Sequence, residues 1–118
     1  LEDGLIGNTS HVHDSQNYTF ENISTFRALY KHSLTIRRSG CSALDLAYVA
    51  AGRLDAFWAN GLGVWDIAAG MLIAEEAGAL TSDFLGNPDY KKSDHYLCAT
   101  PKCFKQMLEA IKPNFKAN

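Results

Sequence analysis

The stretch that most constrains the fold spans residues 65–78 and reads WDIAAGMLIAEEAG. It predicts a helix whose two ends are both marked. Asp66 is expected at the N-cap, where its side chain would accept a hydrogen bond from a backbone N–H of the first turn. Gly78 suits the position just past the helix, where a left-handed backbone carries no Cβ penalty. The apolar residues between them form a wide stripe at helical spacing, so we expect this helix to pack.

The remainder of the chain alternates strand patterns with helix patterns, and the connections are short. This order predicts an α/β layered sandwich with a mixed sheet flanked by helices, in one domain over residues 1–118. A polar, turn-rich loop is expected over residues 9–18. We expect strands at 1–8, 33–38, 55–59, 80–84 and 96–100, and helices at 22–32, 43–51, 65–78 and from Pro101 onward.

Composition excludes some classes of partner. The chain has 118 residues, of which 47% are hydrophobic and 20% charged, as in an ordinary soluble domain or part of one. A net charge of -2 gives no electrostatic case for binding nucleic acid or an anionic membrane. No apolar run approaches the length of a membrane span. Because the chain begins with Leu1 rather than Met, we expect it to be a fragment or a processed product.

The three cysteines, Cys41, Cys98 and Cys103, are odd in number, and their spacing matches no zinc pattern. We therefore expect free thiols in a reducing cytoplasm. His11, His13 and Asp14 leave two interpretations open. Histidines at i and i+2 share a strand face and could bind a metal, whereas histidines in a polar loop are more often solvated.

Two blocks of the sequence resemble a known family. Residues 65–78 match the pattern W-D-x-A-A-G-x-x-[IL]-x-x-E-A-G, which is similar to the C-terminal signature of the inositol monophosphatase family of magnesium-dependent phosphatases. Residues 37–55, RRSGCSALDLAYVAAGRLD, also resemble this family, and most closely its bacterial members. The similarity extends over roughly residues 34–112.

The resemblance implies roles for four residues. The Asp of the W-D pair binds magnesium in this family, so Asp66 is expected to be a ligand of Mg²⁺, a hard cation that takes carboxylate and phosphate oxygens. Gly40, Cys41 and Ser42 match the turn that lies against the substrate in the family. Without the resemblance, Asp66 would be a plain helix cap, and the other three residues an ordinary strand-to-helix turn.

The resemblance also implies an activity and an assembly. We expect a cytoplasmic, lithium-sensitive, homodimeric phosphomonoesterase that hydrolyses a sugar or polyol phosphate similar to inositol 1-phosphate. Arg37 and Arg38 match a pair near the dimer contact of bacterial relatives, although they are equally well explained as the solvated end of a strand.

Two departures from the family pattern limit this reading. The family takes its other metal ligands from an N-terminal half, through a G-E-E-like segment and a D-P-[IL]-D-G-[ST] motif, and neither occurs in these residues. The chain thus resembles a C-terminal half that is inactive alone, and no catalytic residue beyond the metal ligand is assigned. Ala59 stands where relatives commonly place a carboxylate that grips sugar hydroxyls. Either the substrate differs from myo-inositol phosphate, or Asn60 compensates.

A second function from a different class stays open. Some bacterial relatives contact the transcription machinery, and the missing metal motifs together with Ala59 are also consistent with a non-catalytic α/β binding or assembly module.

Overall fold

A five-stranded mixed sheet forms the centre of the protein. The computed structural model describes residues 3–10, 19–33 and 35–114, and in these ranges the expected α/β fold is confirmed. The strands are β1 (Leu5–Ser10), β2 (Thr35–Arg37), β3 (Ala56–Asn60), β4 (Leu80–Ser82) and β5 (His95–Ala99). The helices are α1 (Thr19–His32), α2 (Ser42–Ala50), α3 (Val64–Glu76) and α4 (Pro101–Ile111), with short 3-10 helices η2 (Tyr90–Lys92) and η3 (Lys112–Asn114).

The strand order is β2-β1-β3-β5-β4. β1 runs parallel to both β2 and β3, whereas β5 is antiparallel to β3 and β4. β3 is therefore the central strand, and all of its residues are buried, as expected for a strand covered on both faces. Its side chains alternate between two cores: Phe57 and Ala59 face one, and Ala56 and Trp58 face the other.

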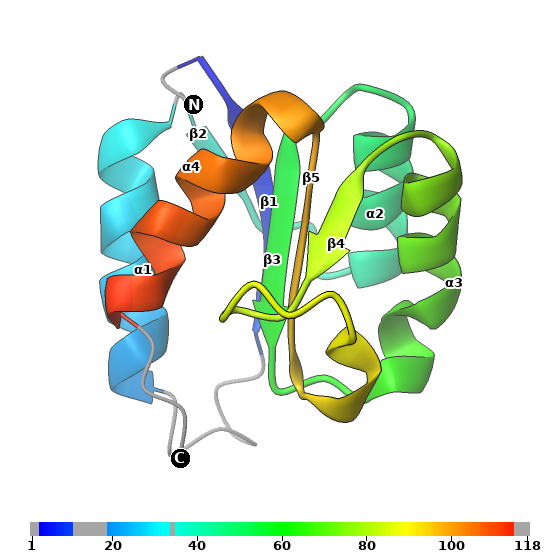
Figure 1. Ribbon diagram of the computed structural model, residues 1–118. Coiled ribbons are helices and arrows are strands. Elements are labelled where there is room, and N and C mark those ends of the chain that lie inside the picture. The colour runs from blue at the N-terminus through cyan, green and yellow to red at the C-terminus, as the bar shows by residue number, and fades with distance from the viewer. Residues whose placement is uncertain (1–2, 11–18, 34, 115–118) are drawn as a thin grey trace.

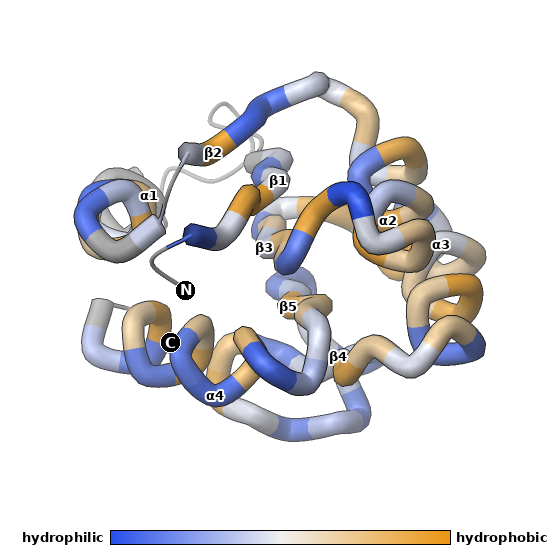
Figure 2. The backbone as a smooth tube through the Cα atoms, turned by 90° about the horizontal axis from the view of Figure 1, so that it is seen from above, coloured by the Kyte–Doolittle hydropathy of each residue, from blue (hydrophilic) through white to orange (hydrophobic). Residues whose placement is uncertain are grey.

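Helices cover both faces of the sheet. Figures 1 and 2 show α1 and α4 together on one face and α2 and α3 together on the other. Leu46, Ile67 and Met71 are buried on the α2/α3 face, and Leu29 and Met107 on the opposite face. None of the helices in the described part of the chain is long and apolar enough to cross a membrane.

The expected N-cap of α3 is wrong by three residues. The helix begins at Val64 with Gly63 as its N-cap, so Asp66 is the third helical residue. Its carboxylate still caps the helix, but from inside, because Oδ2 accepts the Gly63 N–H over 3.1 Å. The other end is as expected. Gly78 has a φ of 100°, its N–H donates to the Glu75 carbonyl, and the next N–H donates to the Ala74 carbonyl, which closes a Schellman motif.

Two strand boundaries also differ from the sequence prediction. β1 reaches Ser10 rather than ending near Asn8, because parallel pairing with β3 continues to its last residue. β4 ends at Ser82, because the Asp83 carboxylate accepts the N–H groups of Leu85 and Asn87 and turns the chain there. Of the expected 9–18 loop, residues 11–18 lie outside the described residues, and with them His11, His13 and Asp14.

Candidate functional site

The candidate site lies at the carboxyl edge of the parallel strands. Thr9 pairs with Ala59 and Ser10 with Asn60, so β1 and β3 end at the same edge. A short connection leads from β3 into α3, and another leads from β2 into α2. Figure 1 shows both helices starting on the lower side of the sheet, toward which the arrowheads of β1 and β3 point. Ligands of open α/β sheets characteristically bind outside this edge.

Asp66 is an exposed carboxylate held in place at the start of α3. Its backbone N–H donates to the Gly63 carbonyl over 3.0 Å, while its Oδ2 accepts the Gly63 N–H. Gly63 thus holds both the backbone and the side chain of Asp66 in place. A carboxylate offers about four lone-pair positions, so one N–H contact leaves most of its capacity for a cation.

The loop that precedes Asp66 is anchored to the sheet. The Gly61 N–H donates to the Asp94 carbonyl over 2.9 Å. The hydroxyl of Tyr96, on β5, lies 3.0 Å from the Leu62 carbonyl and 2.8 Å from the Ser93 carbonyl. Burial, together with nearby carboxylates, raises the pKa of Tyr96 to about 12, so this hydroxyl stays protonated and donates. The start of α3 is therefore positioned by β5 as well as by its own cap.

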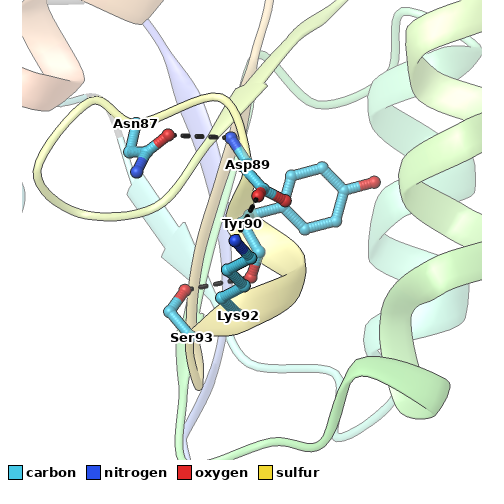
Figure 3. Close-up of polar contacts among 5 residues, drawn as sticks. All are labelled: Asn87, Asp89, Tyr90, Lys92 and Ser93. Atoms are coloured by element: carbon cyan, nitrogen blue, oxygen red, sulfur yellow. Dashed lines mark hydrogen bonds and ion pairs between the residues drawn. The ribbon is translucent and has the colours of Figure 1, made fainter.

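The segment between β4 and β5 continues this support. Figure 3 shows the ring of Tyr90 projecting from η2 toward α3, with Asn87 and Ser93 bonded to the loop backbone and Lys92 paired with Asp89. The Tyr90 hydroxyl donates to Glu75 Oε1 on α3 over 3.0 Å. The exposed ion pair of Lys92 and Asp89 contributes little to stability. The hydrogen bond from Tyr90 to Glu75, by contrast, ties the loop to α3, the helix that carries Asp66.

The second part of the site is the turn at Gly40, Cys41 and Ser42. Gly40 has a φ of 83°, a left-handed conformation that favours glycine, and a side chain there would meet no atom within 4 Å. Cys41 is exposed and is the N-cap of α2, but its side chain makes no capping bond. The first turn of α2 therefore has no side-chain cap from Cys41, and uncapped N–H groups suit an anionic or hydroxyl-bearing ligand.

The sequence reasoning missed the support of this turn. Ser39 Oγ donates to Asp45 Oδ1 over 2.9 Å, and the Cys41 N–H donates to Ser39 Oγ over 3.1 Å. Asp45 is only 1% exposed, and its Oδ2 has no hydrogen-bond partner among the described residues. Burial raises the pKa of Asp45, while Ser39 and the nearby Arg37 act in the opposite direction. The available signal was a single charged residue within the otherwise apolar helix segment SALDLAYVA.

The other residues singled out in the sequence have these positions. Ala59 is fully buried in the core under α2 and α3, and Asn60 is buried at the end of β3. Arg37 and Arg38 are exposed at and just after the end of β2. Cys98 and Cys103 are free thiols in the two different cores, on opposite faces of the sheet.

The described residues can supply part of a metal site. Among them, no three His, Cys, Asp or Glu side chains lie close enough together to hold a metal ion. The fixed and exposed carboxylate of Asp66 fits the hard-ligand chemistry of Mg²⁺ and can contribute one ligand of a composite site.

Comparison with known proteins decides the family. The model of the inositol monophosphatase family matches residues 2–114. This chain belongs to the inositol monophosphatase family. A protein of Pseudomonas aeruginosa PAO1 described as "Nus factor SuhB" is 45% identical over 115 residues, which cover 97% of this chain and 42% of that relative. Its counterpart in Escherichia coli K12 is 41% identical over 110 residues, covering 93% of this chain and 41% of that protein.

Solved structures agree with this assignment. The suhB protein of Bartonella henselae has a TM-score of 0.88 at 34% identity and covers 98% of this chain. Inositol monophosphatase from Anabaena has a TM-score of 0.86 at 28% identity and covers 95% of this chain. Only 43% and 44% of those two chains are matched, so the chain spans less than half the length of its relatives. The predicted family and fold are confirmed.

Proposed function

We propose that this chain is the C-terminal part of a magnesium-dependent phosphomonoesterase that hydrolyses a sugar or polyol phosphate. The observation that carries the proposal is the placement of Asp66. Its carboxylate is exposed, fixed by Gly63 and located at the carboxyl edge of the parallel strands of a family phosphatase fold. At this position the carboxylate is accessible to a cation as well as to the N–H group that it caps.

Each part of the edge has a role in this reaction. Asp66 would hold one Mg²⁺ ion, which when bound would supply neutralisation of the phosphoryl charge and an activated water. The turn at Gly40, Cys41 and Ser42 receives the alcohol part of the substrate with the N–H groups at the start of α2. Ala59 offers no hydroxyl contact from β3, because it is buried and has no polar side chain. In this proposal the hydroxyl groups of the sugar or polyol therefore contact the turn rather than residue 59.

The remaining ligands come from outside these residues. Apolar side chains on the outward face of α3 support this point: Trp65 is 82% exposed, Leu72 57% and Ile73 54%. Figure 2 shows apolar colouring around α2 and α3. A helix that is apolar on both faces is normally covered on both. We infer that the part of the family protein missing from this match covers α3 and completes the metal site.

The same proposal includes the assembly. Arg37 and Arg38, exposed near the end of β2, lie at a homodimer contact of the complete protein, which is cytoplasmic and sensitive to lithium.

The test is an Asp66→Asn substitution in the complete gene product. Asparagine keeps an oxygen that can accept the Gly63 N–H, so the helix start is preserved while the negative charge is lost. We expect Mg²⁺-dependent phosphatase activity to be abolished and the unfolding midpoint to stay unchanged. Glu76→Gln is the matched control, since it removes an exposed carboxylate from the same helix and should keep full activity. Activity retained by a folded Asp66→Asn protein would contradict the proposal.

A second candidate is favoured by the names of the relatives. Because proteins described as "Nus factor SuhB" are 45% and 41% identical to this chain, the second proposal is a non-catalytic role in assembly with the transcription machinery. In that case Asp66→Asn leaves association with RNA polymerase intact, as measured by co-elution of the complete gene product. A reading frame without the acidic motifs, together with no Mg²⁺ binding by calorimetry, would favour this function over phosphatase activity.

A further inference from the structure

A buried carboxylate lies directly beneath the exposed turn. Asp45 is in the first turn of α2, and its side chain packs against β1. A Cβ added to Gly7 would lie 3.2 Å from Asp45 Cγ and 3.3 Å from its Cβ. The carboxylate is therefore enclosed by the strand below and the turn above. Its one hydrogen bond to the turn is the 2.9 Å contact with Ser39.

Ser39 connects Asp45 to the backbone of the turn, because its hydroxyl contacts both. Its hydroxyl has a single proton and two candidate acceptors, Asp45 Oδ1 at 2.9 Å and the Cys41 carbonyl at 3.3 Å. A carboxylate is the stronger acceptor, so the proton points down toward Asp45. The lone pairs of Ser39 Oγ then face the Cys41 N–H, which donates to it over 3.1 Å. Without the carboxylate, the hydroxyl would rotate toward the Cys41 carbonyl and this N–H would lose its acceptor.

The turn has little other support. Gly40 has no heavy atom within 4 Å of the position where a Cβ would stand, and Cys41 is exposed. If capping of α2 were the only need, Ser or Asp at position 41 would meet it at the surface. The chain instead keeps a charge in its core, which costs free energy unless the charge is well paired.

We propose that Asp45 is a positioning residue that, through Ser39, holds the turn at Gly40, Cys41 and Ser42 in the conformation that receives the alcohol part of the substrate. The role of the turn in binding substrate rests on the proposed function. The relay from Asp45 through Ser39 to the Cys41 N–H rests on the contacts alone.

The first experiment follows hydrogen exchange of the Cys41 amide in the complete gene product, by mass spectrometry with residue-level fragmentation. Because a hydrogen bond in this relay is charge-assisted, its loss in Ser39→Ala should speed exchange at Cys41 by roughly tenfold. Asp45→Asn, which removes the charge and keeps the shape, should also speed it. Ser39→Thr retains the hydroxyl and should restore slow exchange.

The control separates a local effect from general loosening. Ser93 Oγ bonds to the Tyr90 and His95 carbonyls in a different loop, so Ser93→Ala removes a comparable contact elsewhere. It should leave exchange at Cys41 unchanged. The proposal is overturned if Cys41 exchanges equally fast in wild type, Ser39→Ala and Asp45→Asn, or if Ser93→Ala accelerates it as much as Ser39→Ala does.

Kinetics then test the link to substrate. Ser39→Ala and Asp45→Asn should raise KM for the phosphate ester while the Mg²⁺ concentration for half-maximal activity stays the same, and Ser39→Thr should restore KM. Faster exchange with an unchanged KM would show that the turn does not receive substrate and would overturn that part of the inference. A wild-type protein without phosphatase activity would overturn the proposed function, and the exchange result alone would then decide whether Asp45 holds the turn.

Discussion

Gly70 on α3 lies in close contact with Leu46 on α2, and replacing it with alanine tests this packing. A Cβ at position 70 would lie 2.7 Å from Leu46 Cδ1 and 2.8 Å from Leu46 Cβ. The Cδ1 contact can be relieved by a rotation of the side chain, but the Cβ contact cannot. The two helices would have to separate by about 0.6 Å to restore an ordinary contact of 3.4 Å. Such overpacking costs about 1–3 kcal/mol.

A gain in helix propensity opposes this cost. Alanine is favoured over glycine inside a helix by about 1 kcal/mol. The expected net loss for Gly70→Ala is therefore about 1 kcal/mol, which lowers the urea midpoint by roughly 0.5 M at an m-value near 2 kcal/mol/M. Urea unfolding followed by circular dichroism measures this shift.

The neighbouring position supplies the control. Ala69 is exposed on the same helix, so Ala69→Gly measures the propensity term alone and should destabilise by about 1 kcal/mol. If Gly70→Ala instead stabilised the protein by the amount that Ala69→Gly destabilises it, the close approach of α2 and α3 would be refuted.

Two further predictions concern the segment around β5. Tyr96→Phe removes the donor to two loop carbonyls, one of them buried, and should cost about 1–3 kcal/mol in the same urea assay; an unchanged midpoint would show that the hydroxyl does not hold the loop before α3. His95 Nδ1 accepts the Phe84 N–H over 3.0 Å, and burial lowers the pKa of His95, with Asp83 and Asp94 opposing the shift. Because the pKa of His95 is lowered in the folded state, the unfolded chain binds the imidazole proton more readily. The contribution of His95 to stability is therefore complete above the ordinary histidine pKa near 6.5. It is lost as the pH falls through the lower pKa of the folded state. His95→Asn should remove this part of the pH dependence, and a wild-type curve that is flat below pH 6.5 would contradict the assignment.

Periodicity and turn chemistry were enough to predict the layers of the fold. The alternation of elements predicted the α/β class, and Gly78 marked the end of α3 correctly. The start of α3 was misplaced because Asp is favoured both at the N-cap and in the first turn, where its carboxylate can accept an N–H from either position. The extended backbone of Gly63, with a φ of -80° and a ψ of 156°, selects the second arrangement. A sequence pattern does not distinguish the two.

The candidate site was predictable only in part, for a similar reason. Asp66 and the turn at Gly40 are local features that a motif can mark. Asp45 and Tyr96 act across the fold, because one supports a turn from beneath and the other reaches a loop 34 residues away. Their roles depend on the direction of a buried side chain, which the pairing of β1, β3 and β5 determines and the local sequence does not.

Asp66 follows Trp65 directly, so the proposed metal ligand lies next to the exposed apolar side chains of α3. Trp65 is 82% exposed and begins the outward apolar stripe that continues through Leu72 and Ile73. A surface that covers Trp65 would lie close to the Asp66 carboxylate, which is the next residue of the helix. That surface would exclude water there and so strengthen the interaction between the carboxylate and a cation, which solvent screens strongly when the edge is open. In the proposed function, the surface that covers α3 would therefore also complete the metal site to which Asp66 contributes one ligand.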